Sequence, residues 1–172
     1  MPRATVRAAI VDYLQAASTT TPGLQVVGQV FAHPPLFTSE ATFFQNSWSG
    51  KSQGALIYVF LEEQFEQRIR LIGNQLGGKM RTYKVKLICF LRSTLVNAQD
   101  VDAANDTFLD ALVLAIQENR QPGGAATVFQ WGEGDEVGGI DIHVTAGWPR
   151  TIRAQIKQVY SVVEVLAIEM NT

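Results

Sequence analysis

Apolar residues recur at every third or fourth position in two segments of the chain, residues 4–17 and residues 98–120. A period of 3.6 residues collects such side chains on one side of a helix, so both segments are predicted to be amphipathic α-helices. Asn97 is a good N-cap for the second helix. The predicted buried stripes are Val6, Ala9, Ile10, Tyr13, Leu14 and Ala17 in the first helix, and Val101, Ala104, Phe108, Leu112, Ala115 and Ile116 in the second.

Elsewhere, β-branched and aromatic residues gather in short stretches, several of which alternate with polar residues in the way typical of antiparallel strands. The predicted fold class is therefore α+β, a mostly antiparallel β-sheet packed with two amphipathic helices. Residues 1–172 are expected to form a single domain. The predicted strands are a short one within 24–31, then 55–62, 67–71, 80–92, 128–131 and 140–145.

Residues 151–170 are apolar and β-branched, and we predict that they form an extended C-terminal strand region. The same residues also fit a helical period, so a helix is the alternative. One unbroken strand of this length would span about 65 Å at roughly 3.3 Å per residue, which is too long for a domain of this size. We therefore expect the region to bend, to split into a hairpin or to project beyond the body.

Two features of the central part of the chain point to contacts with another protein. Residues 32–54 are predicted to be a long loop that carries three large aromatic side chains, Phe43, Phe44 and Trp48. Aromatic residues argue against disorder, so we expect this loop to pack, and a neighbouring subunit could provide the surface. Residues 55–61 are apolar on both faces of the predicted strand. The second face should therefore be covered by a helix or by another subunit.

The composition narrows the class of protein. Hydrophobic residues make up 47% of the chain and charged residues only 17%, so a monomer would leave apolar surface exposed. A formal net charge of −2 lacks the basic excess that phosphate contacts with nucleic acid require. Cys89 is the single cysteine, which excludes a disulfide within the chain. No segment resembles a membrane span or a signal peptide, so we expect a protein made and used on the cytoplasmic side.

The run Gly73–Lys79 resembles a phosphate-binding loop that follows a strand. That motif needs Ser or Thr directly after its lysine to hold Mg²⁺, and here the residue is Met80. It also needs a following helix, whereas a strand is predicted to follow. We therefore interpret the run as a hairpin loop.

Other residues with catalytic or metal-binding chemistry are interpreted as structural. His33 and His143 have no metal-binding spacing, and Cys89 lies in mid-strand on an apolar face, where a cysteine is usually a small buried hydrophobe. A Cys–His nucleophilic pair would require the fold to bring them together. The acidic residues are interpreted as solvent-exposed, on a helix face for Asp102, Asp106 and Asp110, and in a loop for Glu133, Asp135 and Glu136. We predict no catalytic residue, no metal site and no cofactor, and no enzyme activity.

A set of basic residues follows adjacent predicted strands, and the candidate interface includes part of it. Three interpretations stand in this order: an ordinary solvated sheet face, pairing with an acidic neighbour such as the acidic helix face of another copy, and contact with the phosphates of passing DNA. The basic set is Arg68, Arg70, Lys79, Arg81, Lys84 and Lys86. The candidate residues of a subunit or partner interface are Arg68, Arg70, Lys79, Arg81, Phe43, Phe44 and Trp48.

In order, size and texture, the chain resembles the tail terminator (tail completion) proteins of long-tailed bacteriophages and, more loosely, other neck proteins of the head–tail junction. The similarity lies in the opening helix Val6–Leu14, in the glycine loop that runs into a long strand over Gly77–Leu87, and in the helix Asp102–Arg120. The chain departs from that pattern in its aromatic segment 32–54 and in the length of its C-terminal strand region. No signature motif is involved.

The resemblance implies a ring, a hexamer, that caps the tail tube and docks the tail to the connector of the filled head. Its partners would be further copies of itself, the tail tube protein and the connector or stopper protein, with DNA passing through the lumen without sequence specificity. It implies a virion location, assembly in the host cytoplasm, no enzyme activity, no cofactor and no membrane. The alternatives are another neck component (a head-completion or stopper protein), a small-ligand binder or enzyme, and a tail-tube subunit.

Overall fold

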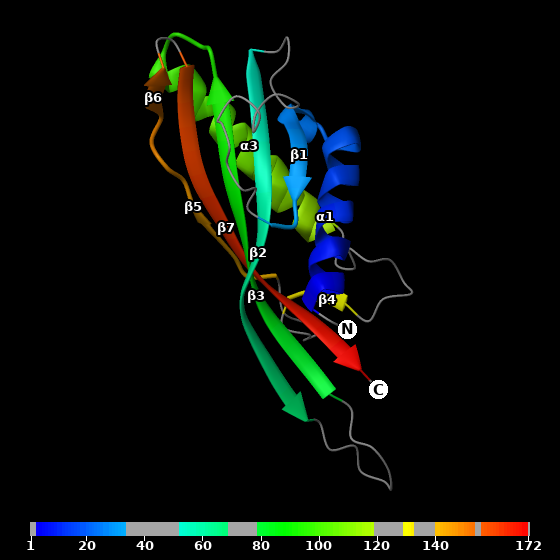
Figure 1. Cartoon of the computed structure of the whole chain (residues 1–172). Helices are drawn as coiled ribbons and strands as arrows, with labels where there is room; N and C mark the ends of the chain where they lie inside the picture. The colour runs from blue at the N-terminus through cyan, green and yellow to red at the C-terminus, as the bar shows by residue number, and fades with distance from the viewer. Residues whose placement is uncertain are drawn as a thin grey trace, which may run out of the picture.

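A computed structural model describes residues 3–33, 52–68, 79–118, 129–132, 140–153 and 156–171. It consists of two long helices and a mostly antiparallel sheet, so the predicted α+β class is confirmed (Figure 1). The elements are α1 (Arg3–Thr20), the 3₁₀ turn η1 (Leu24–Val26), β1 (Val27–Phe31), β2 (Gln53–Arg68), β3 (Lys79–Ser93), α3 (Ala98–Glu118), β4 (Phe129–Trp131), β5 (Ile142–Thr145), β6 (Arg150–Arg153) and β7 (Ile156–Asn171).

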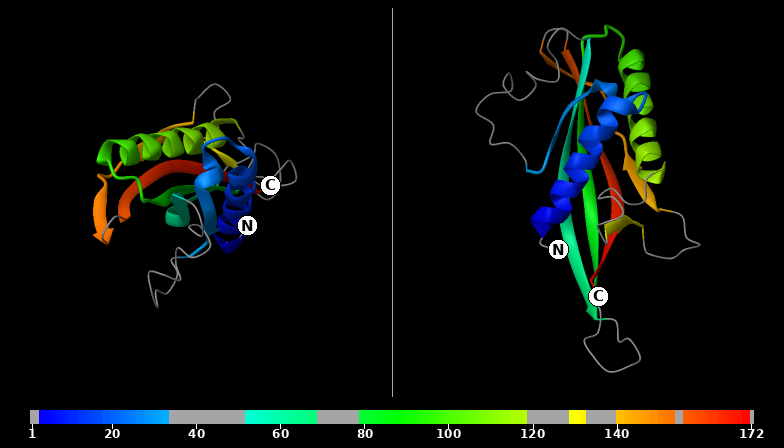
Figure 2. Two further views of the ribbon diagram at one scale, coloured as in Figure 1. Left: turned by 90° about the horizontal axis from the view of Figure 1, so that it is seen from above. Right: turned by 90° about the vertical axis from the view of Figure 1, so that its right-hand side faces the viewer.

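The sheet is built around β3, which lies between β2 and β7. In the described residues the strand order is β1-β2-β3-β7-β4, and β5 and β6 also pair with β7. The β1–β2 pairing is parallel and every other pairing is antiparallel. All 15 residues of β3 have partners in β7. The three long strands form a twisted ribbon that runs past the N-terminal end of α1 (Figures 1 and 2).

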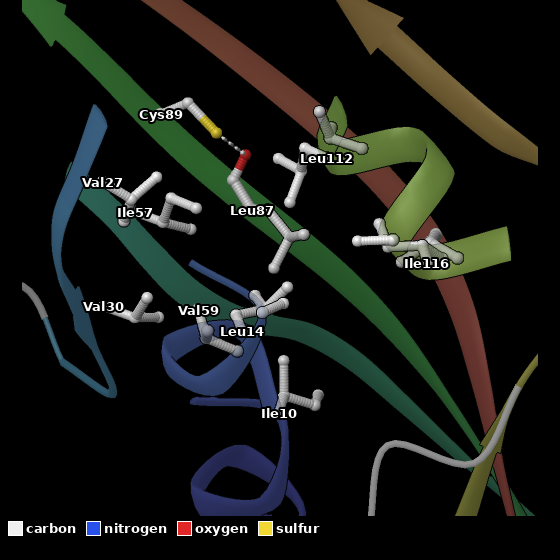
Figure 3. Close-up of a cluster of buried hydrophobic side chains, with 14 of the residues drawn as sticks. Ile10, Leu14, Val27, Val30, Ile57, Val59, Leu87, Cys89, Leu112 and Ile116 are labelled. Atoms are coloured by element: carbon white, nitrogen blue, oxygen red, sulfur yellow. Dashed lines mark hydrogen bonds between the residues drawn. The ribbon is translucent and has the colours of Figure 1, made fainter. Parts of the chain in front are cut away.

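Both helices pack on one face of this sheet. Side chains alternate along a strand, and in β3 the odd-numbered residues from Tyr83 to Leu91 enter the core. They meet Ile10 and Leu14 of α1 and Leu112 and Ile116 of α3 (Figure 3). This shared cluster positions the two helices, and burying each such side chain stabilises the fold by about 1.5–3 kcal/mol.

Hydrogen bonds from side chains fix the helices further. The hydroxyl of Tyr13 in α1 donates to the backbone carbonyl of Ala115 in α3. Asn105 of α3 and Ser161 of β7 are both buried and hydrogen-bonded to each other, with Nδ2 to Oγ at 3.3 Å. Because a buried amide needs partners, this pair favours one seating of α3 on the sheet.

The helix predictions are confirmed, with an extension of α1 by one turn. The prediction ended that helix at residue 17, but α1 continues through Ser18, Thr19 and Thr20. The Ser18 and Thr19 hydroxyls donate to the carbonyls of Gln15 and Ala16, each at 2.7 Å, which satisfies groups that a helix end otherwise leaves open. The second helix is described from residue 98 to residue 118, and residues 119–120 lie outside the described residues.

The strand predictions need one correction, and the predicted strand region 151–170 is confirmed. Residues 55–62 and the start of 67–71 belong to one strand, β2. The sequence pattern does not show this continuity, because a bulge between Leu61 and Glu63 shifts the alternation of the side chains. The region 151–170 is strand rather than helix, and it splits: β6 pairs antiparallel with β7, as in a hairpin. Most of the predicted loop 32–54, from residue 34 to residue 51, lies outside the described residues, and β2 already begins at Gln53.

The helices do not cover the second face of residues 55–61. The buried core takes Ala55, Ile57, Val59 and Leu61 from β2. On the other face Leu56 and Tyr58 are also buried, whereas Phe60 is 45% exposed. Among the described residues, α1 and α3 both belong to the core side. We call the second face of the sheet the open face. The prediction was that a helix or another subunit covers this face. In the described part of the chain, no helix covers it.

Gly147 is a close-contact position between the β5–β6 connection and β7. A Cβ atom at Gly147 would lie 2.0 Å from the backbone oxygen of Tyr160. We expect Gly147→Ala to lower the free energy of unfolding by about 1–3 kcal/mol, because one backbone segment must move away from the other. Urea unfolding followed by circular dichroism would measure the change.

The control for this prediction is Thr145→Ala, a truncation at a nearby exposed residue. It should change the free energy of unfolding by no more than about 0.5 kcal/mol. An unchanged unfolding midpoint for Gly147→Ala would contradict the close approach of the two segments.

Candidate protein interface

The predicted interface residues that the structure describes gather at one end of the sheet. Arg68 ends β2 and pairs in register with Lys79, which begins β3, and Arg81 pairs with Glu66. We call residues 62–68 of β2 and 79–84 of β3 the arm, which extends beyond α1 (Figure 1). The other predicted interface residues, Arg70, Phe43, Phe44 and Trp48, lie outside the described residues.

Arg81 is held by acidic groups of its own chain. Its Nε lies 2.9 Å from Oε2 of Glu66, and its guanidinium lies 3.7 Å from Oε2 of Glu169. Glu169 is fully buried and also accepts a 2.8 Å hydrogen bond from the hydroxyl of Tyr83. A buried carboxylate requires such partners, so Arg81 compensates a charge inside the arm. Burial raises the pKa of the Tyr83 phenol, which therefore remains a donor to Glu169.

Lys84 and Lys86 form a second internal network on the open face. Glu62 lies 3.1 Å from Nζ of Lys84 and 2.7 Å from Nζ of Lys86, and Glu164 lies 3.0 Å from Nζ of Lys86. Hydrogen bonds from Lys86 and Lys84 lower the pKa of Glu62 and keep it ionised. Two lysines therefore face two glutamates, and this part of the open face is electrically balanced. Of the three interpretations of the basic set, this pattern favours an ordinary solvated sheet face for these lysines.

An aromatic row crosses four strands of the sheet next to this network. Phe31 stacks on Tyr58 with ring centroids 5.5 Å apart, Tyr58 meets Phe90 edge-on at 5.8 Å, and Phe90 meets Tyr160 at 5.2 Å. Tyr160 is 48% exposed. Burial raises the pKa of Tyr58, so its phenol stays protonated. Within the row Tyr58 is buried and Tyr160 is exposed. An exposed aromatic side chain beside balanced charges is typical of protein–protein contacts rather than of nucleic-acid contacts.

Among the described residues, exposed apolar side chains lie at both ends of the sheet. Phe65 on the arm is 70% exposed, and Trp148 in the β5–β6 connection is 82% exposed. Neither residue is among the predicted interface residues, nor are Phe60 and Tyr160. A signal existed for Phe65, because it is the single aromatic residue in the polar run from Glu62 to Arg68.

A pocket of about 370 Å³ lies on the open face, where β3, β5 and β7 meet. Lys84, Asp141, His143 and Glu164 supply its polar lining. A pocket with several polar groups is what the ligand-binding alternative predicts. Two of those groups already contact each other, because Lys84 lies 3.9 Å from Glu164. Within the described residues, no three His, Cys, Asp or Glu side chains are placed to hold a metal ion.

The structure does not bring Cys89 and the histidines together. Cys89 is buried in the core, where its Sγ donates a hydrogen bond to the carbonyl of Leu87 at 3.6 Å (Figure 3). Burial raises the pKa of its thiol, which disfavours the nucleophilic thiolate. His143 is exposed and pairs in register with Glu164, on the face opposite Cys89. His33 is exposed, and its Nδ1 accepts a 2.8 Å hydrogen bond from Nη1 of Arg7.

The acidic face of α3 is present as predicted. Asp106 and Asp110 are exposed and Asp102 is half-buried. The helix contains no lysine or arginine between Ala98 and Glu118, so it offers no internal counter-charge.

Comparison with known proteins does not assign the chain to a family. No protein-family model matches the chain, and no curated protein matches it. Among solved structures, it is similar to a chain described as "Virion of native gene transfer agent (GTA) particle", with 13% sequence identity over 94% of this chain and 93% of that chain. The TM-score is 0.28, which does not establish a shared fold.

A search of the described helices finds none that is both long enough and apolar enough to cross a membrane.

The lysine–glutamate network should make the stability of the folded protein depend on pH. Because the pKa of Glu62 is lower in the folded protein than in the unfolded chain, its stabilising contribution is fully present above the unfolded value of about 4.3. It is lost as the pH falls through the folded pKa. We expect Glu62→Gln to unfold at lower urea concentration than the wild type at neutral pH, and the two midpoints to converge in acid.

The matched control is Asp106→Asn, which also removes one carboxylate but from an exposed position on α3. Its urea midpoint should follow that of the wild type at each pH. If Glu62→Gln and Asp106→Asn behave alike, the network does not stabilise the arm.

Proposed function

We propose that the protein is a structural virion protein, a tail terminator that forms a ring of six copies, caps the tail tube and joins the tail to the head connector. DNA passes through the lumen of this ring without sequence-specific contacts. The protein acts without catalysis and without a cofactor. Assembly takes place in the host cytoplasm, and the mature protein resides in the neck of the virion.

The observation that carries this proposal is the character of the open face and the arm. Lys84 and Lys86 are balanced by Glu62 and Glu164, while Phe60, Phe65 and Tyr160 stay exposed. A surface with aromatic side chains and little unbalanced charge suits a permanent contact with another protein. The order of elements also follows the resemblance noted in the sequence, an opening helix, a long strand after a glycine-containing segment and a second helix.

A second neck role, head completion or stopper, would use the same kind of surface with different symmetry and neighbours. The polar pocket beside His143 is the observation that favours a ligand-binding role instead. That role receives less support, because Lys84 and Glu164 in the pocket already contact each other.

The mass of the purified protein in solution tests the ring. Light scattering should give a closed assembly near six copies, and electron microscope images should show rings, because a repeated head-to-tail contact closes when its rotation is complete. A stable monomer or dimer that binds a small ligand in the pocket beside His143 would contradict the proposal.

A deletion of the gene tests the position in the virion. Without a terminator, we expect tails of uncontrolled length and filled heads that carry no tail. Expression of the wild-type protein from a plasmid should restore joined particles, which is the control. Normal tail length with unjoined heads would indicate a stopper or head-completion protein instead.

A further inference from the structure

We propose that the tip of the arm in one copy, at Glu63 and Phe65, contacts Trp148 and Arg150 at the opposite end of the sheet in a second copy. This subunit contact rests on the proposed function, because both require the chain to associate with itself.

The first half of the contact is an exposed aromatic residue next to an unpaired acid. In register, Glu63 pairs with Lys84 and Phe65 pairs with Thr82, so the two side chains share one face of the arm. Both are exposed. Lys84 makes its ion pairs with Glu62 and Glu164. Glu63 makes no ion pair with the part of the chain that the structure describes, which leaves its charge available to a partner.

The second half has the opposite charge and again an exposed aromatic residue. Arg150 begins β6, is exposed and pairs in register with Gln158 of β7. Gln158 accepts a 2.9 Å hydrogen bond from Nε of Arg92. Arg150 has no ion pair among the described residues. Trp148, two residues before it, is 82% exposed.

The two halves cannot meet within one molecule. Phe65 lies across the sheet from Ile168 through Thr82, and Arg150 lies beside Gln158. These two positions of β7 are about ten residues apart, or roughly 33 Å at 3.3 Å per residue. The arm and β6 lie at opposite ends of the ribbon in Figure 1. A contact between them therefore joins different surfaces of two copies, which is the head-to-tail type that closes into rings.

The chemistry of the halves is complementary. A carboxylate beside a phenyl ring can pair with a guanidinium beside an indole, so that the ion pair and the aromatic contact form together. An arginine can also stack on the Phe65 ring. Aromatic residues and arginine are the residues that most often dominate the centre of a protein interface. A copy of this chain supplies both halves, so a second copy is the occupant that fits.

Charge reversal and its rescue test this contact. Glu63→Arg and Arg150→Glu should each raise the dissociation constant of the wild-type assembly at least about tenfold, because each places like charges together. The double variant should return it to within about threefold of the wild type. Light scattering over a range of protein concentrations measures all four proteins, and circular dichroism checks that each is folded.

Asp12→Arg is the matched control, since it makes the same change of charge as Glu63→Arg at an exposed position of α1. It should leave the dissociation constant within about threefold of the wild-type value. If both single reversals associate like the wild type, or if the double variant stays as weak as the singles, the contact is wrong while the ring proposal stands. A wild-type chain that stays monomeric at millimolar concentration overturns the contact, and the gene deletion then still decides the virion role.

Discussion

β3 is paired on both sides along its length, with β2 and with β7, and the rest of the structure depends on this double pairing. The alternation of its side chains sends Tyr83, Val85, Leu87, Cys89 and Leu91 into one core. A slip of one residue would turn these side chains to the open face and bring Lys84 and Lys86 under the helices. The register of β3 therefore decides at once where the helices pack and where the charges lie.

The two faces of the sheet differ in how their side chains are covered or paired. On the core side, helices cover the apolar residues, and the polar groups that are buried there have partners, as Asn105 and Ser161 do. On the open face, Lys86 is compensated by Glu62 and Glu164, but the aromatic residues do not have a described helix above them. A partner protein that covered Phe60 and Tyr160 would remove their surface from water, which is why the open face matters for function.

Strand edges explain why association would involve the arm rather than the other side of the sheet. The edge strand β1 is close to α1, and its Val30 amide donates to Oε1 of Gln15 at 2.9 Å, so a helix side chain occupies part of this edge. β1 reaches along β2 only as far as Tyr58. Beyond that point Arg3 donates to the carbonyl of Leu61, and β2 then continues into the arm. No described strand pairs with the outer side of β2 there. The arm is thus the less protected part of the edge.

Local pattern in the sequence was enough to determine the two helices, most strands and the α+β class, because periods of 3.6 and 2 residues depend on neighbouring residues alone. The amphipathic stripes of residues 4–17 and 98–120 became the buried faces of α1 and α3. Only the tertiary structure decided that Glu62 forms a bulge, that Glu62 and Glu164 neutralise Lys84 and Lys86, and that Phe65 and Arg150 stand at opposite ends of one sheet. Those outcomes depend on which strands become neighbours, and residues far apart in the chain meet only after long-range pairing has set the register.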